Sequence, residues 1–349
     1  MLESLLDKVR RYPGVLSKVA LAPVISSFDQ NNPSGFSNGD DTAVLKNGKG
    51  YDLFAVEGFL PDFVANDPWF AGWCGVMVNV SDIAAMGGRP RAVVNALWQS
   101  SDESAKQIFL GMKAASETYG VPIVGGHTSH KSDTTQLAVS ILGHANQVLS
   151  SFDAKAGDAI IVAMDQRGEF RAPYLNWNAT TNAPAERLRG DLELLPLLAE
   201  KGYLTGCKDI SQAGLLGTLA MFMDCSQTGA DIFLNDIPKP KQVKWDDWLC
   251  AFPSFGFLMT CPVGRIDDVT ALFKSRDIDA ACIGHVTERP SIDVTYIDAT
   301  STDANSIDRR LGVEQDTSHL KQTAVFWDFE KNHFLGFRKS ADQKESLCL

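Results

Sequence analysis

Asp40 and Asp41 are adjacent carboxylates that follow Gly39 in the segment GDDTAVL (residues 39–45). In a regular strand, neighbouring side chains point to opposite faces, so both acids face one cation only where the strand begins irregularly. Aspartate and glycine are also common in ordinary turns. The segment therefore predicts either a plain turn or a cation site at the beginning of a strand.

A third carboxylate, Asp82, lies near the C-terminal end of an expected helix, in the segment NVSDIAAMGGRP (79–90). The helix dipole disfavours a negative charge at that end, and small apolar residues surround the position. An unpaired charge in such surroundings is costly. The position therefore predicts a cation or basic partner for Asp82, unless the side chain is simply exposed at the helix end.

The segment IVGGHTS (123–129) resembles a strand that ends in Gly125, Gly126 and His127. Two glycines allow backbone N–H groups to approach a ligand closely. His127 would then bind metal or phosphate, or it would be a hydrogen-bonded structural histidine. The sequence has no HExxH or comparable spacing, so we do not expect a zinc site.

Familiar nucleotide motifs are missing from the sequence. It contains no G-x-x-x-x-G-K-[ST] loop and no G-x-G-x-x-G after a strand. The segment GFSNG (35–39) matches the G-x-S-x-G pattern of serine hydrolases. That pattern needs a preceding apolar strand and a following helix, and neither is expected here, so we regard the match as accidental.

Composition excludes several classes of protein. The 349 residues include 43 acidic and 32 basic side chains, a formal charge of −11, which disfavours general nucleic-acid binding. No apolar run of about 18 residues suggests a membrane span, and the acidic Glu3 and Asp7 do not suit a signal peptide. Seven cysteines without a CxxC pair are typical of a reducing compartment, so we expect a cytoplasmic protein.

Strand-like and helix-like segments alternate in the first half of the chain and predict an α/β or α+β layer built on one sheet. A second unit begins near residue 154, and we expect domains at 1–150 and 151–337 and a polar tail at 338–349. The expected strands are 51–57, 91–98, 121–125, 135–143, 158–164, 254–261 and 280–287. The expected helices begin near residues 2, 68, 102, 185 and 212, with a further helix between the last two strands.

The order of these segments resembles the superfamily of aminoimidazole ribonucleotide (AIR) synthetase, thiamine-monophosphate kinase, selenophosphate synthetase and the hydrogenase maturation dehydratase. The resemblance is closer to AIR synthase-related proteins than to any of these enzymes. It covers about residues 35–300, and NVSDIAAMGGRP is its most specific part. Besides the three segments above, it is carried by AVEGF (55–59), GDAIIVA (157–163), KDISQAGLLGTLAMFMDCSQTGADIFL (208–234) and IGHVTE (283–288).

The resemblance implies an N-terminal sheet-plus-helix domain that dimerises through its sheet, followed by a C-terminal α+β domain. ATP would lie near the dimer interface, with Mg²⁺ between carboxylates and the triphosphate. The implied metal ligands are Asp40, Asp41, Glu57 and Asp82, and the implied catalytic residues are Asp41, Asp82 and His127. The implied cofactor contacts are Gly39, Thr42, Gly125 and Gly126, and Asp209 would face the acceptor.

Some residues depart from the family patterns. Glu57 stands where many relatives have aspartate, and GGH replaces the GGD of the kinases. No cysteine precedes GDDTAVL, so the reactive cysteine of selenophosphate synthetases is missing. Cys348 is a poor substitute for the C-terminal cysteine of the hydrogenase maturation factor.

The leading hypothesis is an ATP- and Mg²⁺-dependent enzyme that phosphorylates a small-molecule acceptor, as a kinase or as a dehydrating ligase or cyclase. One alternative is thiamine-monophosphate kinase or the purine-pathway AIR synthetase, and another is a nucleotide-binding regulatory subunit without turnover. The expected partners are ATP, an acceptor and a second copy of the chain. Trp248, Phe252, Phe255 and Phe257 would form core, or else an apolar acceptor pocket.

Overall fold

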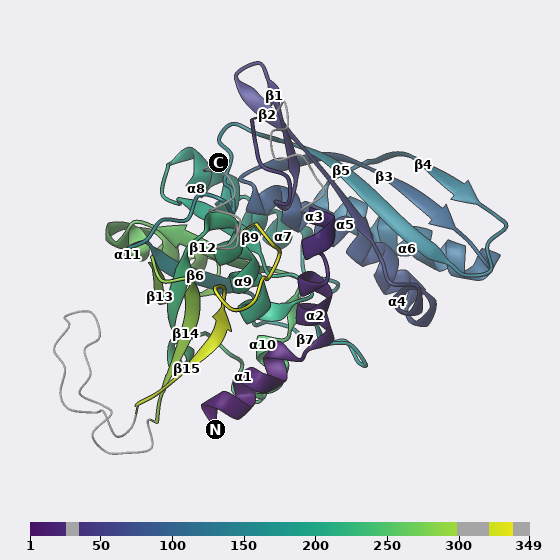
Figure 1. The fold of residues 1–349 in the computed structure, drawn as a ribbon. Helices are drawn as coiled ribbons and strands as arrows, with labels where there is room; N and C mark the ends of the chain where they lie inside the picture. The colour runs from purple at the N-terminus through teal and green to yellow at the C-terminus, as the bar shows by residue number, and fades with distance from the viewer. Residues whose placement is uncertain (26–34, 299–320, 338–349) are drawn as a thin grey trace, which may run out of the picture.

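The computed structural model describes residues 1–25, 35–298 and 321–337 (Figure 1). Two large sheets carry the helices, so the expected mixed α/β architecture is present. The five-stranded sheet has the order β1-β2-β5-β3-β4, and the seven-stranded sheet has the order β15-β14-β10-β13-β6-β12-β9. A small third sheet has the order β11-β8-β7. The expected tail and Cys348 lie outside the described residues.

The five-stranded sheet is covered on one face by two long helices, α5 (Pro68–Ala85) and α6 (Asp102–Tyr119). These helices approach each other closely at two glycines. A Cβ atom on Gly72 would lie 2.0 Å from the Ile108 carbonyl oxygen, and one on Gly111 would lie 1.8 Å from that of Trp69. The strands are β1 (Ala43–Asn47), β2 (Gly50–Gly58), β3 (Arg89–Trp98), β4 (Ile123–Ser129) and β5 (Gln136–Ala145).

Local signals define helix α5, as the sequence predicts. The Asp67 carboxylate accepts a hydrogen bond from the Phe70 N–H at 3.4 Å, and Pro68 occupies the first turn, where no N–H is needed. Gly87, with φ of +74°, ends the helix in a left-handed conformation. Nearly every residue of α5 is buried, which places Asp82 inside the protein.

The seven-stranded sheet lies between two hydrophobic cores, because side chains alternate along its central strands. In β6 (Ala159–Met164), Ile160 and Val162 face the core under α9 (Gly214–Ser226), whereas Ile161 faces the core under α11 (Ile266–Lys274). The other strands are β9 (Gly206–Asp209), β10 (Gly229–Phe233), β12 (Gly256–Cys261), β13 (Asp279–Thr287), β14 (Ser291–Ile297) and β15 (Lys321–Asp328).

The first helices pack against the second half of the chain. Leu6 of α1 (Leu2–Arg10) and Val15 of α2 (Pro13–Val19) belong to the core around α9. The remaining elements are α3 (Ala22–Ile25), α4 (Pro61–Asn66), α10 (Trp245–Leu249), β7 (Glu169–Phe170), β8 (Asn176–Asn178), β11 (Phe252–Pro253) and the 3₁₀ turns Leu234–Asp236 and Val263–Arg265.

One expected helix differs in the structure. The segment predicted as a single helix from 185 to 201 forms α7 (Ala185–Leu192) and α8 (Leu194–Glu200). Pro196 has no N–H to donate to the Leu192 carbonyl, so a continuous helix would lose a hydrogen bond there. The elements that were not predicted include the strands β9, β10, β14 and β15 and the helix α2.

No helix within residues 1–25, 35–298 and 321–337 is both long and apolar enough to cross a membrane. The six cysteines in the same part of the chain are free thiols.

Candidate functional site

Three of the predicted acidic residues line one pocket between the two large sheets. Glu57 comes from the end of β2, Asp82 from α5 and Asp209 from the end of β9. The cavity has a volume of about 140 Å³. Its other walls are mainly aromatic and polar, and include Phe59, Phe63, Tyr174, Phe252, Lys18, Ser211 and Gln212. Elements far apart in the sequence thus bring three carboxylates to one place.

Asp82 is buried inside the protein. Its side chain belongs to a residue that is 5% exposed, and its Oδ2 atom has no hydrogen-bond partner within the described residues. Burial raises its pKa well above the usual value, and the nearby carboxylates of Asp209 and Glu57 raise it further. The interpretation of Asp82 as an exposed helix-end residue is therefore wrong, and the position favours a cation.

Asp41 forms an ion pair with Lys208 of β9, and both side chains are 6% exposed. The Asp209 N–H donates a hydrogen bond to Asp41 Oδ2 at 3.4 Å. Burial raises the pKa of Asp41 to about 7, although Lys208 opposes this shift. Burial lowers the pKa of Lys208, but the carboxylates of Asp41 and Asp40 outweigh it and the net shift is upward. Lys208 therefore remains a charged ammonium.

The neighbouring Asp40 has different partners. Its carboxylate accepts hydrogen bonds from Ser150 Oγ at 2.6 Å, Ser151 Oγ at 2.7 Å and the Ser151 N–H at 3.1 Å. These serines follow β5, so Asp40 ties the start of β1 to the connection between the two sheets. The two adjacent acids do begin a strand irregularly, but here they do not share a partner.

Gly39 and Thr42 flank Asp40 and Asp41 in the sequence. Gly39 adopts a φ of +104°, and a Cβ atom there would lie 2.3 Å from the Phe337 ring, so the position suits only glycine. Thr42 is buried, and its Oγ1 has no hydrogen-bond partner within the described residues. The Ser211 Oγ, in the wall of the pocket, also lacks one. Unpaired buried hydroxyls in and near a pocket are typical of a site that receives a ligand or water.

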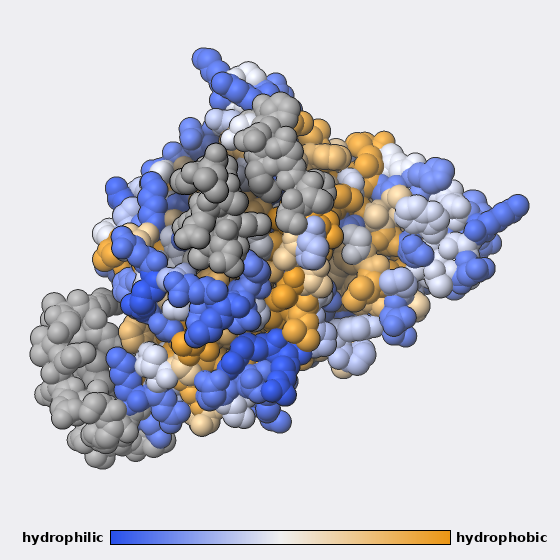
Figure 2. Space-filling model, viewed as in Figure 1, coloured by the Kyte–Doolittle hydropathy of each residue, from blue (hydrophilic) through white to orange (hydrophobic). Residues whose placement is uncertain are grey.

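The third predicted segment lies elsewhere. Gly125, Gly126 and His127 are exposed on β4, the edge strand of the five-stranded sheet, and do not line the pocket. Within one chain the structure does not bring His127 to the carboxylates. The sheet face opposite α5 and α6 exposes large apolar side chains, and Figure 2 shows apolar surface over this region. They include Leu45, Phe54, Val56, Val94, Val124 and Leu142.

The carboxylates do not form an assembled metal centre. Across residues 1–25, 35–298 and 321–337, no three histidine, cysteine or acidic side chains are placed to hold an ion. The donor chemistry nevertheless fits Mg²⁺, which prefers carboxylate oxygens, and the unpaired Oδ2 of Asp82 offers such an oxygen. One candidate ligand, Asp41, is already bound to Lys208.

Sequence reasoning missed two lysines of this region, Lys18 and Lys208. Lys208 had only a weak signal, its position beside Asp209 in the segment GCKD, which the structure buries as β9. Lys18 had none, since its helix α2 reaches the pocket only through tertiary packing. Of the four aromatic residues interpreted as core or as an acceptor pocket, three are core, namely Trp248, Phe255 and Phe257. Phe252 lines the cavity.

Two family models match the chain. Residues 39–145 match the N-terminal domain of AIR synthase related proteins, and residues 155–297 match their C-terminal domain. The "Uncharacterized protein sll0787" of Synechocystis sp. is 41% identical over 301 residues, which cover 86% of each chain. The thiamine-monophosphate kinase of Synechococcus elongatus is 29% identical, over 87% of this chain and 98% of that protein.

The same fold occurs in a larger protein of known structure. Thermotoga maritima PurL complexed with ATP superposes with a TM-score of 0.68 at 18% identity. The match covers 84% of this chain and 52% of PurL, so the chain spans about half the length of that protein.

Proposed function

The chain belongs to the AIR synthase-related family, and we propose that it is an ATP- and Mg²⁺-dependent enzyme that transfers a phosphoryl group to a small-molecule acceptor. One observation carries the proposal: the unpaired, buried carboxylate of Asp82 faces a pocket that Glu57 and Asp209 also line. The ATP in the PurL complex and the kinase activity named for the Synechococcus relative support this choice of nucleotide and reaction.

Asp82 and Glu57 are the proposed metal ligands in the pocket, with Asp41 and Asp40 at its border. A bound Mg²⁺ would neutralise charge on the transferred phosphoryl group, which explains why no lysine-bearing phosphate loop is needed. Lys208 pairs with Asp41 in this structure. A bound Mg²⁺ would compensate the charge of Asp41 in its place, and the Lys208 ammonium would then be available to the phosphates.

Asp209 is the proposed contact to the acceptor. Burial raises its pKa to about 6, with Lys208 opposing and Glu57 adding to the shift. A carboxylate of this pKa is largely ionised at neutral pH and suits the role of a general base towards an acceptor hydroxyl or amide. The apolar walls formed by Phe59, Phe63 and Phe252 would exclude water from the reacting groups.

A second copy of the chain is the proposed partner for the exposed sheet face. Val56 and Val124 on that face are 60% and 64% exposed, and exposed apolar patches of this kind mark interaction sites. Pairing of two such faces would bury them and would place β4, with Gly125, Gly126 and His127, at an interface. This arrangement gives the IVGGHTS segment a role that it does not have within a single chain.

Calorimetric titration with a non-hydrolysable ATP analogue, with and without MgCl₂, tests the nucleotide and metal assignment. We expect binding to require Mg²⁺ and to weaken at least about tenfold in Asp82→Asn. Asp133→Asn, which changes an exposed acid on the loop before β5, is the matched control. An affinity for the ATP analogue that changes neither with Mg²⁺ nor with the Asp82 substitution would contradict the proposal.

Turnover distinguishes an enzyme from a regulatory subunit. ADP release from ATP is followed with a panel of phosphorylated and amide-bearing acceptors that includes thiamine phosphate. An enzyme shows acceptor-dependent release that Asp209→Asn reduces. Retention of ATP without release across the panel would instead indicate the regulatory alternative.

A further inference from the structure

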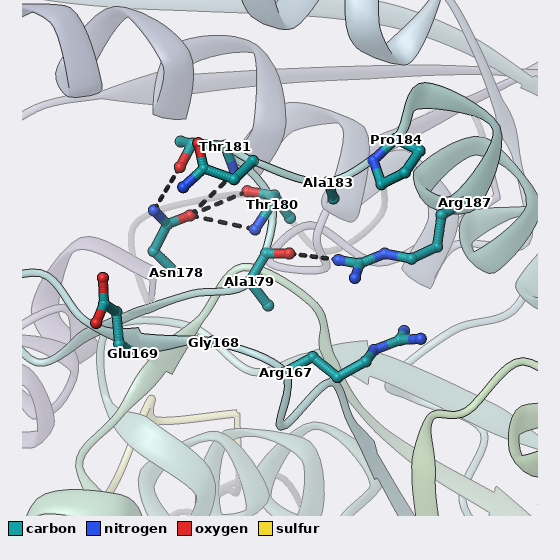
Figure 3. Close-up of a pocket in the computed structure, with 11 residues that line it drawn as sticks. Arg167, Gly168, Glu169, Asn178, Ala179, Thr180, Thr181, Ala183, Pro184 and Arg187 are labelled. Atoms are coloured by element: carbon teal, nitrogen blue, oxygen red, sulfur yellow. Dashed lines mark hydrogen bonds between the residues drawn. The ribbon is translucent and has the colours of Figure 1, made fainter.

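A second pocket lies apart from the carboxylate pocket and shares no lining residue with it. Its volume is about 300 Å³. Arg167, Gly168 and Glu169 form one wall, and the loop of residues 178–184 with Arg187 forms the other (Figure 3). None of its lining residues is aromatic or is one of the predicted site residues.

The charges that face this pocket are mainly positive. The side chains of Arg167 and Arg187 lie on opposite sides of the hollow in Figure 3, and Glu169 supplies the only lining carboxylate. Behind the arginines, Asp165 accepts from Arg167 Nε at 2.7 Å and from Arg187 Nη2 at 3.2 Å.

Asp165 belongs to a larger buried network that does not line the pocket. Asp191 bonds Arg276 Nε at 2.5 Å and lies 3.4 Å from Arg167 Nη2. Both aspartates are 1% exposed, whereas the arginines retain 22–32% exposure. Together with Glu169, the two aspartates balance the three guanidinium groups, and the exposed parts of Arg167 and Arg187 are those that line the pocket.

The wall opposite Arg167 is already ordered. The Asn178 Oδ1 accepts from the Thr180 N–H at 3.2 Å and the Thr181 N–H at 3.3 Å. Arg187 donates to the Ala179 carbonyl, and the Ala179 N–H donates to Ser254 Oγ at 2.9 Å. A preformed wall of this kind loses little conformational entropy when a ligand binds.

A helix N-terminus provides further donors for an anion. The Arg187 Nε is not one of them, because it is buried and lies 4.0 Å from Asp191 Oδ2 in the network behind the pocket. The pocket lies at the N-terminus of α7, where the N-cap residue Pro184 has no side-chain acceptor for the first-turn N–H groups. Such a terminus carries partial positive charge and favours negative ligands.

We propose that this second pocket binds a small polar anion, the phosphate or carboxylate group of a non-aromatic molecule, between Arg167 and Arg187. Guanidinium groups suit both kinds of anion because their planar N–H donors pair with two oxygens. The lack of aromatic lining excludes stacking of a nucleobase. The site goes beyond the proposed phosphoryl transfer and does not need ATP or Mg²⁺.

Calorimetry with inorganic phosphate and with malonate, in the absence of nucleotide and Mg²⁺ and at constant ionic strength, tests the site and distinguishes the two anion classes. We expect saturable binding of at least one of them to the full chain. The affinity should fall by at least about tenfold in Arg187→Gln, because a charged hydrogen bond is lost.

A second variant avoids the buried network. Asn182 is an exposed lining residue, so Asn182→Asp adds a repelling charge without removing a partner of Asp165, and Asn182→Gln is its neutral control. We expect Asn182→Asp to weaken binding and Asn182→Gln and Asp82→Asn to preserve it. The proposal is overturned if neither anion saturates, or if Asn182→Asp binds as the unchanged chain does.

Discussion

The Asp41 carboxylate and the Lys208 ammonium form a buried ion pair that joins the loop before β1 to strand β9. Water cannot screen this pair, because each side chain is 6% exposed. In the part of the chain that the structure describes, the nearby Asp82 Oδ2 has no hydrogen-bond partner. The negative charges of Asp41 and Asp82 are therefore unequally compensated, and a metal ion that binds Asp41 would compete with Lys208 for that carboxylate.

Replacement of Lys208 by methionine should expose this competition. Loss of one partner of a buried pair leaves an uncompensated charge, so Lys208→Met should lower the free energy of unfolding by about 3–5 kcal/mol without metal. Mg²⁺ should restore more stability to the variant than it adds to the unchanged chain. Thermal denaturation with and without MgCl₂ measures both effects.

The matched control is Lys241→Met, which changes an exposed lysine on the connection before α10. It should leave the melting temperature and its response to Mg²⁺ unchanged. If Lys208→Met lost the same stability with and without Mg²⁺, Lys208 would be a structural residue alone.

The acidic pocket should make the metal-free protein less stable as pH rises. Burial raises the folded-state pKa of Asp209 to about 6 and of Asp41 to about 7, above the ordinary 3.8. The folded state then binds protons more tightly than the unfolded state, so this stability is present below pH 3.8 and is lost as pH rises through the folded-state values.

Denaturant unfolding at several pH values between about 4.5 and 8 measures this slope. The free energy of unfolding should decline less with pH in Asp82→Asn, because Asp82 also has a raised pKa and its carboxylate repels that of Asp209. The decline should also be smaller with Mg²⁺. An identical slope in the unchanged chain and in Asp82→Asn would show that Asp82 does not contribute.

The exposed sheet face should mediate self-association. A charge on its central strand β5 would be buried on pairing, so Leu142→Asp should convert a dimer into monomers. Light scattering coupled to size-exclusion chromatography measures the mass. Val263→Asp, at a residue that is 54% exposed in the 3₁₀ turn Val263–Arg265, is the control and should leave the mass unchanged. A single-chain mass for the unchanged protein would contradict the proposed dimer.

The contact between α5 and α6 should be intolerant of a methyl group. Gly111→Ala would place its Cβ 1.8 Å from the Trp69 carbonyl oxygen, so the helices must separate. We expect a loss of about 3 kcal/mol or more in unfolding free energy, as in overpacked cores. Gly264→Ala, with no atom within 4 Å of the added carbon, should be nearly neutral in the same denaturant assay.

Local features of the sequence determined the family and the long helix that carries Asp82. Asp67, Pro68 and Gly87 act within one helical turn of the helix ends, so their effect is readable without the rest of the fold. The segment GDDTAVL likewise predicted either a turn or an irregular strand start, and in the structure Asp40 and Asp41 lie in a bend immediately before β1.

Only the tertiary structure decided how these residues are paired. Asp41 and Lys208 are 167 positions apart, and Lys18 reaches the pocket from a helix that packs against α9. The Asp40 carboxylate accepts hydrogen bonds from Ser150 and Ser151, and His127 does not line the pocket. The sequence determines the chemical type of each residue and the local geometry of its segment. Which of these side chains are buried, which charges are paired and which residues meet in one pocket depends on how the two sheets pack together.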